Sequence, residues 1–491
     1  TTKTDSYRPI QLPSVIDKCY DGMLNNRLTK HLEQAGRLHE AQNAFRRGRD
    51  CLEHVLTLHT VAQRRREQGL DTFFFFNDQE KAYDTAWRLA IVHKLWDKGV
   101  QGKMLRVVSG LLANTTASVS QGGVRSREFI VTQGVEQGGT LSPTLFNVFV
   151  DDLLAVTWAN CAGVPIERFD GSVGKLVSVM FADDFAAVTA SEGELQALVD
   201  QAHTHYADWR MKANVPKCAV MVVRGKGAAA RRQAPLQIRW GGAAGPLIPQ
   251  VESYTYMGVT LHASCKWDAQ LLRAKDKTWG AANALASLLR TRGTSADVKR
   301  MASVVLLRPT TEWGAGVWRL TRSDMPRLDS LQADILKTSF HCPATICHSA
   351  LLLELGLRPM SLWCDKRLLE FWHRVQNMED LRIVKQVVLG ASGVEQQARA
   401  RGGARQRTWL DHVAEALHEW GIDMERAASM NYSHFKHLLH KTLPRVWERR
   451  LAAERATKPA LDVHVSLCSR AGVFCVRHAL SARRRRLQQG S

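Results

Sequence analysis

Apolar side chains in the first hundred residues follow two spacings, and each predicts a different element. Residues 13–36 carry them three and four positions apart, which places side chains on one face of an α-helix. We therefore predict an amphipathic helix that ends at Gly36. The run DTFFFFND at residues 71–78 is continuously apolar and aromatic, which is typical of a buried strand, and a second helical pattern follows it as far as Gly99.

The same patterns continue further along the chain. The stretch SPTLFNVFVDDLLAVTW, at residues 142–158, predicts a helix with Ser142 as its N-cap and Pro143 in its first position. The stretch KLVSVMFADDFAAVTA, at residues 175–190, predicts a strand, a tight turn and a second strand. A Ser-x-x-Glu capping box at Ser191 then begins another helix. This order of elements predicts an α+β unit with carboxylates at one end of its sheet.

The second half of the chain has a different pattern. Beyond about residue 270 it predicts a series of helices with few strands. Residues 391–407 are rich in Gly and basic residues and poor in apolar ones, which is typical of a linker or an exposed loop. The last residues, ARRRRLQQGS, are typical of a basic tail.

Two pairs of adjacent aspartates differ in their setting. Asp151 and Asp152 fall within the predicted helix at residues 142–158, where successive side chains point in different directions, so we expect them on a solvated helix edge. Asp183 and Asp184 fall at the turn of the predicted hairpin, between apolar strands. The cost of burying charge there must be offset by bound cations or by hydrogen bonds.

Asp78, which ends the aromatic strand, is a third carboxylate in a similar setting. Three carboxylates on adjacent strand ends suit a pair of Mg²⁺ ions, because this cation prefers oxygen ligands. Two such ions about 4 Å apart can activate a hydroxyl nucleophile and stabilise a leaving pyrophosphate. The spacing alone leaves this two-metal site and a purely structural turn equally open.

Composition and charge narrow the class of partner. The 491 residues include 67 Lys and Arg against 47 Asp and Glu, a formal charge of +20, which favours a polyanionic partner such as nucleic acid. No uninterrupted apolar stretch reaches the roughly 18 residues of a membrane span. The first residues do not resemble a signal peptide, so we expect no membrane partner.

The ten cysteines are spaced like neither a disulfide framework nor a Cys-x-x-Cys zinc site, so we expect an intracellular, reducing compartment. One cluster gathers possible metal ligands within eight residues, namely His341, Cys342, Cys347 and His348. It has no second half, and Pro343 interrupts it. A zinc site and ordinary buried or loop residues are both open interpretations, and the second is favoured.

Seven sequence blocks, taken in order, resemble the successive motifs of reverse transcriptases from LINE-type (non-LTR) retrotransposons. The blocks span residues 7–261 and are YRPIQLPSVIDK, QNAFRRGRD, DQEKAYD, EQGGTLSPTLFNVFVDDL, FADD, NVPKCAVM and YMGVTL. Each block alone is weak, but the ordered set is highly specific. The region after them is similar to that of trypanosomatid elements of the ingi kind. The resemblance implies an α+β right-hand polymerase fold of fingers, palm and thumb, followed by a mostly helical C-terminal region.

The resemblance also implies an order of domains. It predicts fingers at 1–70, a palm with inserted finger elements at 71–250, a primer-grip hairpin at 251–265, a helical thumb and post-thumb region at 266–390, a linker or exposed loop at 391–408, and a helical C-terminal region with a basic tail at 409–491. The catalytic motifs would then fall in the palm.

By this resemblance, Asp78 is the first-strand catalytic carboxylate, and Asp183 and Asp184 are the pair of the FADD turn. Together they would ligate two Mg²⁺ ions, for which Mn²⁺ is an alternative. Lys217 matches a lysine that can give a proton to pyrophosphate, and a solvated lysine near a turn is the alternative. Tyr83 matches a ring beneath the sugar that would clash with a ribose 2′-OH and so favour dNTPs; an ordinary core ring is the alternative. RNA-directed RNA polymerases usually lack this ring.

Other matched residues are implied to contact substrate or primer. Gln137 and Gly138 match the segment that packs on the incoming nucleotide and template, with Glu136 in place of the usual Pro. Finger-block arginines match residues that meet the triphosphate or template backbone, although each alone is equally typical of a surface charge: Arg8, Arg46 and Arg49. Residues of the last block match the primer grip, although a tight turn would have the same residues: Tyr256, Met257 and Gly258.

The function implied is that of an RNA-directed DNA polymerase, which transfers nucleotides from dNTPs to a primer 3′-OH on an RNA template. The expected partners are the RNA template, a DNA primer or target, and dNTPs. The sequence begins almost at the first matched block, with no recognisable endonuclease before it, so we expect a separate endonuclease domain to nick the target DNA. The alternative is a catalytically silent RNA-binding protein that retains the fold. We expect a nuclear location with a cytoplasmic ribonucleoprotein stage.

Overall fold

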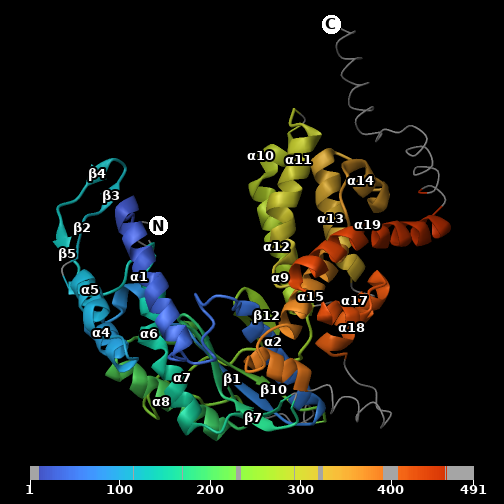
Figure 1. The fold of residues 1–491 in the computed structure, drawn as a ribbon. Coiled ribbons are helices and arrows are strands. Elements are labelled where there is room, and N and C mark those ends of the chain that lie inside the picture. Colours follow the sequence, from blue (N-terminus) through green and yellow to red (C-terminus); the bar gives the residue numbers. More distant parts are fainter. Residues whose placement is uncertain are drawn as a thin grey trace. The chain divides into compact units, whose positions relative to one another are not determined.

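Figure 1 shows the fold of the protein, a computed structural model. The structure describes residues 10–113, 115–168, 170–227, 234–291, 293–318, 325–390, 407–458 and 461. They form two compact units. The first holds the described residues of 1–257, 263–265 and 381–403, and the second those of 258–262, 266–380 and 404–491. Most of the predicted linker and the whole basic tail lie outside the described residues.

A four-stranded antiparallel sheet forms the centre of the first unit. Its strands, in spatial order, are β10 (Ala219–Val223), β1 (Thr72–Asn77), β9 (Asp184–Thr189) and β8 (Ser178–Phe181). All six residues of β1 are buried, as the continuous aromatic run predicts for a central strand. The predicted strand and hairpin are therefore confirmed.

Helices cover this sheet and close the hydrophobic core. Helices α2 (Cys51–Glu67) and α8 (Glu192–Asp208) pack against β1. Helix α8 begins at the predicted cap, where the Ser191 hydroxyl accepts a hydrogen bond from the Glu194 amide. Its apolar face is buried. Each fully buried Leu or Val side chain on this face stabilises the fold by about 1.5–3 kcal/mol.

Helix α1 (Val15–Gln34) confirms the predicted amphipathic helix, and Ser14 caps its first turn. Only the later part of its apolar face is buried, through Leu24, Leu28 and Leu32. The apolar residues of the first turns are exposed: Val15, Ile16, Tyr20 and Met23. The spacing therefore predicted the helix correctly but not how far its apolar face is covered.

The predicted helix at residues 142–158 is present as two consecutive helices, α6 (Ser142–Val150) and α7 (Asp152–Asn160). Pro143 lies in the first turn of α6, as predicted. The N-cap is Leu141 rather than Ser142, and no side chain caps this end.

The expectation that Asp151 and Asp152 lie on a solvated helix edge is wrong. Asp151 is 3% exposed, accepts a hydrogen bond from the His39 amide, and lies 2.7 Å from the Lys98 ammonium. Asp152 lies 3.0 Å from the ammonium of Lys94, a lysine that is itself buried. Two cations from a different helix therefore compensate this acidic pair.

Smaller elements complete the first unit. Three short antiparallel pairs join β2 to β5, β3 to β4 and β6 to β7. The bounds are α3 (Ala82–Thr85), α4 (Arg88–Asp97), α5 (Gly102–Ala113), β2 (Thr116–Ala117), β3 (Ser120–Gln121), β4 (Val124–Arg125), β5 (Phe129–Ile130), β6 (Val164–Glu167), β7 (Val173–Leu176), a 3₁₀ helix (Val215–Lys217) and β11 (Ser253–Tyr256).

The second unit is built mainly of helices, as predicted. It contains β12 (Val259–His262), α9 (Asp268–Ala284), α10 (Ala286–Arg290), α11 (Ala296–Ala302), a π-helical turn (Ser303–Leu307), α12 (Arg308–Glu312), α13 (Met325–Phe340), α14 (His348–Leu355), α15 (Met360–Gln376), α17 (Trp409–Trp420), α18 (Met424–Ser429) and α19 (Tyr432–Thr457). Helix α15 packs against α12, α13, α17 and α19. Within the part of the chain that the structure describes, no helix is long and apolar enough to cross a membrane.

Candidate active site

The FADD turn joins β8 to β9 and places two adjacent carboxylates at one end of the sheet. Phe181 pairs with Asp184, so Ala182 and Asp183 form the two-residue loop between the strands. Ala182 has a φ angle of 56°, in the left-handed region that residues other than glycine rarely adopt. Such a conformation persists only where its surroundings fix it.

Asp78 reaches the same end of the sheet from the neighbouring strand. Asn77, the last residue of β1, pairs with Phe185 of β9. The antiparallel register therefore brings Asp78, the next residue, opposite Asp184. The Asp78 backbone is also held, because its carbonyl oxygen accepts a 2.8 Å hydrogen bond from the Asn214 amide. The structure thus brings together the three carboxylates that the sequence predicts as catalytic.

The electrostatic effect of this cluster is seen at Asp184. Burial, followed by the negative charges of Asp183 and Asp78, raises the pKa of Asp184 to about 7. A divalent cation would reverse this effect, and carboxylate oxygens are the ligands that Mg²⁺ prefers. Among the described residues, no group of three or more His, Cys, Asp or Glu side chains is already gathered around a metal position. The donor set therefore suits Mg²⁺ in chemistry, without being preformed as a coordination shell.

Gln42 supports the turn and was missed by the sequence analysis. Its buried side-chain oxygen accepts hydrogen bonds from the amides of Ala182, at 3.2 Å, and Ala44, at 3.1 Å. The backbone beside it bonds to the edge of β8, through the Asn43 amide and the Met180 carbonyl oxygen. Its only signal in the sequence is its place in the QNAFRRGRD block.

Tyr83 lies near the carboxylates and also packs as a core residue does. Its ring stacks on Phe146, with 4.8 Å between the ring centres, and the residue is half-buried. Burial, and then the charge of Asp183, raise the pKa of the Tyr83 hydroxyl above its ordinary value. The two interpretations of this ring are therefore compatible, because one part is packed and another faces the catalytic end of the sheet.

Gln137 and Gly138 form a turn that meets the start of the described chain. The Gln137 side chain donates a 2.8 Å hydrogen bond to Asp84, and its carbonyl oxygen accepts one from the Gln11 amide. Gly138 has a φ angle of 120°, and a Cβ there would lie 2.6 Å from the Gln11 carbonyl oxygen. Only glycine fits this position.

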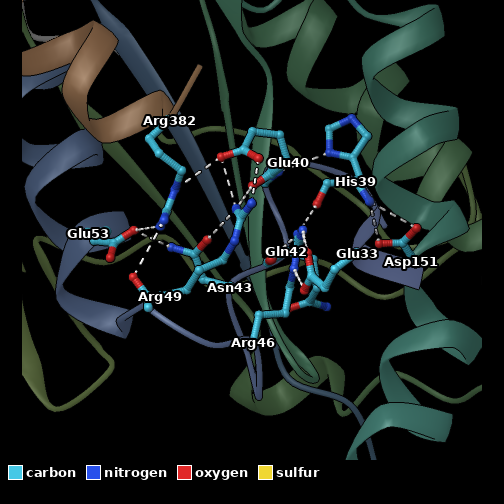
Figure 2. Close-up of polar contacts among 12 residues, drawn as sticks. Glu33, His39, Glu40, Gln42, Asn43, Arg46, Arg49, Glu53, Asp151 and Arg382 are labelled. Atoms are coloured by element: carbon cyan, nitrogen blue, oxygen red, sulfur yellow. Dashed lines mark hydrogen bonds and ion pairs between the residues drawn. The ribbon is translucent and has the colours of Figure 1, made fainter. Parts of the chain in front are cut away.

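Two of the predicted finger arginines are held by carboxylates, as Figure 2 shows. The Arg46 side chain is 6% exposed, and its Nε lies 2.7 Å from Glu33 Oε1. Its Nη1 also donates to the carbonyl oxygen of Gln42, the residue that supports the turn. The Arg49 side chain is 9% exposed, and its Nη2 lies 2.6 Å from Glu40 Oε2.

These contacts give Arg46 and Arg49 a structural role that the sequence analysis did not assign. Direct contact of either with a nucleotide stays a prediction. Arg8 lies outside the described residues. The chain three residues further on, at Gln11, lies against the turn at Gln137 and Gly138.

Lys217 and the predicted primer grip lie on segments next to the carboxylates. Lys217 ends the 3₁₀ helix after Asn214, whose amide bonds to Asp78, and its side chain is exposed. Tyr256 is buried, and its hydroxyl donates a 3.1 Å hydrogen bond to the carbonyl oxygen of Asp184. The chain passes to the second unit in the turn that follows, where Met257 and Gly258 have positive φ angles.

The His and Cys cluster at residues 341–348 does not gather around a metal position among the described residues. The His341 ring bonds to the Arg290 carbonyl oxygen, and the Cys347 thiol contacts Glu454. Burial lowers the pKa of His348 to about 4. The side chains therefore serve separate local contacts.

Comparison with known proteins agrees with this geometry. Residues 1–261 match the family described as reverse transcriptase (RNA-dependent DNA polymerase). A Pol polyprotein from the R2 retrotransposable element of Popillia japonica is 27% identical over 52% of this chain and 35% of its own length. A 115 kDa protein of the R1DM element of Drosophila melanogaster is 27% identical over 73% of this chain and 33% of its own length.

Among solved structures, a telomerase of Candida tropicalis in complex with a fragment of telomeric RNA aligns at 11% identity and a TM-score of 0.38. The alignment covers 87% of this chain and 57% of that one. The chain spans about a third of the length of the curated relatives that it matches. The family match covers more than half of the sequence and contains all three clustered carboxylates. The chain therefore belongs to the reverse transcriptase family, and its relatives are proteins of retrotransposable elements.

Proposed function

We propose that this chain is an RNA-directed DNA polymerase that adds dNTPs to a primer 3′-OH on an RNA template. One observation carries the proposal: Asp78, Asp183 and Asp184 meet at the same end of the palm sheet. They do so in a chain of the reverse transcriptase family. Burial and the charges of Asp183 and Asp78 raise the pKa of Asp184, and a bound divalent cation would lower it again.

The carboxylates would hold two divalent cations, Mg²⁺ by preference, with Mn²⁺ as a substitute. When bound, such ions lower the charge repulsion between a primer hydroxyl and a triphosphate and stabilise the leaving pyrophosphate. The chain's own residues position the substrate. The turn at Gln137 and Gly138 is proposed to pack on the incoming nucleotide and template, beside the Gln11 backbone that lies against Gly138. Lys217 is exposed and follows Asn214, whose amide bonds to the Asp78 carbonyl oxygen, and it is proposed to give the pyrophosphate its proton.

The partners follow from this activity. The template would be an RNA, and the primer a nicked DNA target produced by a separate endonuclease domain. The matched relatives are about three times longer than the aligned region, which leaves room in them for further domains. Because the proposed activity uses a DNA target and an RNA template, we also propose a nuclear site of action with a cytoplasmic ribonucleoprotein stage.

The test is primer extension by the purified chain on an annealed RNA template with Mg²⁺ and labelled dNTPs. The substitution Asp183→Asn removes one ligand charge without removing packing volume, so extension should fall to background while RNA affinity stays within about twofold. Asp208→Asn makes the same chemical change at an exposed position at the end of α8, and it should extend like the parent chain. Tight RNA binding without any extension by the parent would favour the silent RNA-binding protein instead.

A further inference from the structure

The second unit contains a pocket of about 160 Å³ that has no place in the proposed chemistry. Its floor is apolar and comes from buried residues of α13 and the π-helical turn, among them Leu307, Leu331 and Ile335. Three arginines line it as well: Arg300, Arg308 and Arg358. An apolar cavity with a few convergent polar groups is the usual form of a ligand site.

A π-helical turn followed by a proline borders the pocket. Pro309 has no amide hydrogen, so the α-helical hydrogen bond to the Val305 carbonyl oxygen cannot form. The preceding turn, Ser303–Leu307, widens into a π-helical turn before α12 begins. Side chains of this turn line the pocket. Turns of this kind are common at functional sites.

One wall of the pocket has an arginine lying over an aromatic ring. The Arg308 guanidinium lies 4.2 Å from the centre of the Trp363 ring, and both residues line the pocket. The Arg308 Nε is buried and makes no hydrogen bond to any described residue, because its nearest carboxylate oxygen, on Glu312, is 3.6 Å away. The wall therefore offers a flat surface with donor capacity left over.

The other two arginines are only weakly compensated. Arg300 is paired with Asp297 at 3.8 Å, and both side chains are well exposed. A pair of this kind contributes little. Arg358 donates from its Nη1 to the Leu357 carbonyl oxygen, a neutral acceptor. The pocket thus combines an apolar interior with positive charge, and its ligand should combine a flat apolar body with negative charge.

We propose that this pocket binds an unstacked nucleobase of a single-stranded RNA, with Arg300 and Arg358 holding the flanking phosphates. Proteins bind single-stranded RNA by stacking splayed bases on aromatic rings and Arg guanidinium planes, and Arg pairs with phosphate through two parallel hydrogen bonds. The formal charge of +20 favours RNA over an acidic peptide with an apolar anchor. The inference rests on the proposed function only for the class of ligand.

The test uses the full chain carrying Asp183→Asn, without Mg²⁺ or dNTPs, so that binding is measured apart from catalysis. The probe is a short single-stranded RNA with one 4-thiouridine, cross-linked by light and mapped by mass spectrometry. Adducts are expected within the segments 331–336 or 357–363, which contain residues that line the pocket. A matched RNA without bases should bind at least about tenfold more weakly, because it lacks the base that would stack in the pocket.

Three variants separate the base from the phosphates. Ser303→Trp fills the pocket and should abolish the adduct and the preference for RNA with bases, while leaving the salt dependence unchanged. Arg358→Ala should reduce the salt slope by about one phosphate contact. Arg327→Ala removes the same charge from α13 at a position that does not line the pocket, and the adduct should persist.

Either of two results would overturn the proposal. One is a set of adducts confined to positions outside the pocket, and the other is equal affinity for RNA with and without bases. Displacement of the RNA from the pocket by an acidic peptide as readily as by unlabelled RNA would assign the pocket to a protein partner. Primer extension by the chain without Asp183→Asn is measured separately, so failure of the polymerase proposal and failure of the pocket proposal are distinguishable.

Discussion

Tyr83 packs against Phe146, and the proposed function gives its ring a second role, the selection of the sugar. Its ring stacks on Phe146, while burial and the charge of Asp183 raise the pKa of its hydroxyl. Tyr83→Ala should open space beneath the sugar and lower the preference for dNTPs over NTPs about tenfold or more, as measured by single-nucleotide incorporation. Tyr83→Phe keeps the ring and should keep the preference. Unchanged sugar selection in Tyr83→Ala would reduce Tyr83 to a core residue.

His54 makes a second residue-scale prediction, which concerns pH. Burial, and then the positive charges of Arg382 and Arg49, lower the pKa of His54 to about 3. The unfolded chain binds this proton near pH 6.5 and the folded chain does not, so stability from this group is complete above pH 6.5 and is lost as the pH falls towards 3. The loss should reach about 2 kcal/mol at pH 5.

Urea unfolding at pH 7 and pH 5 measures this loss. His54→Leu removes the titrating group. The free energy of unfolding should therefore fall between pH 7 and pH 5 by about 2 kcal/mol less in this variant than in the parent chain. His434→Leu, at an exposed position, should leave the pH dependence unchanged. Equal pH dependence in the parent and His54→Leu would show that this histidine is protonated in the folded chain.

At the scale of elements, residues 381–390 belong to the first unit although they follow helices of the second along the chain. Arg382 is buried and forms ion pairs with Glu53 of α2 and with Glu40, as Figure 2 shows. Arg64 of α2 also donates to the Val388 carbonyl oxygen. This segment therefore holds α2 in place through these contacts. Helix α2 in turn packs against β1, the strand that precedes Asp78.

Arg382→Met should destabilise the first unit by about 3–5 kcal/mol, because it leaves the charge of Glu53 buried without its cation. Adding Glu53→Leu should recover most of that loss. Lys226→Met breaks a more exposed ion pair with Glu67 in the same unit and should cost at most about 1 kcal/mol. Urea unfolding measures the stability of all three variants. If Arg382→Met lowers the free energy of unfolding no more than Lys226→Met does, residues 381–390 do not stabilise the first unit through this ion pair.

Elements of local origin were predictable, and their long-range partners were not. The aromatic run predicted β1, and the alternation around FADD predicted β8 and β9, because burial and turn chemistry depend on adjacent residues. The error at Asp151 arose because Lys98 comes from a helix 53 residues earlier. The ion pair between Arg46 and Glu33 was likewise not predicted, because the two residues are 13 positions apart and no periodicity relates them.

At the scale of the whole molecule, the ordered blocks predicted the reverse transcriptase family, which the comparison confirms. They also predicted which carboxylates meet at the sheet end. They did not predict Gln42 or the pocket of the second unit. Gln42 acts through backbone amides of a strained turn, and the pocket arises where Pro309 meets helices distant in sequence. Both depend on tertiary packing rather than on the order of residues.

The net charge of the molecule makes the final prediction. Arginines such as Arg46, Arg49 and Arg382 are paired with glutamates within the first unit, and these pairs cancel, so the net charge of +20 comes from other cations. The remaining surface cations should still neutralise about six or more phosphates of a primed RNA template, each releasing counterions. Affinity should therefore fall about a thousandfold between roughly 50 and 200 mM salt. Fluorescence anisotropy with labelled primer and template measures this slope.

Two variants show which arginines and lysines contribute to the salt dependence of RNA affinity. Arg46→Ala removes a charge that is already paired with Glu33, so it should change stability rather than the salt slope. Lys217→Ala removes an exposed charge and should lower the slope by about one phosphate contact. A flat salt dependence in the parent chain would contradict a phosphate-dominated grip. If Arg46→Ala lowers the salt slope without changing stability, Arg46 contacts the triphosphate or template backbone, as the resemblance implied.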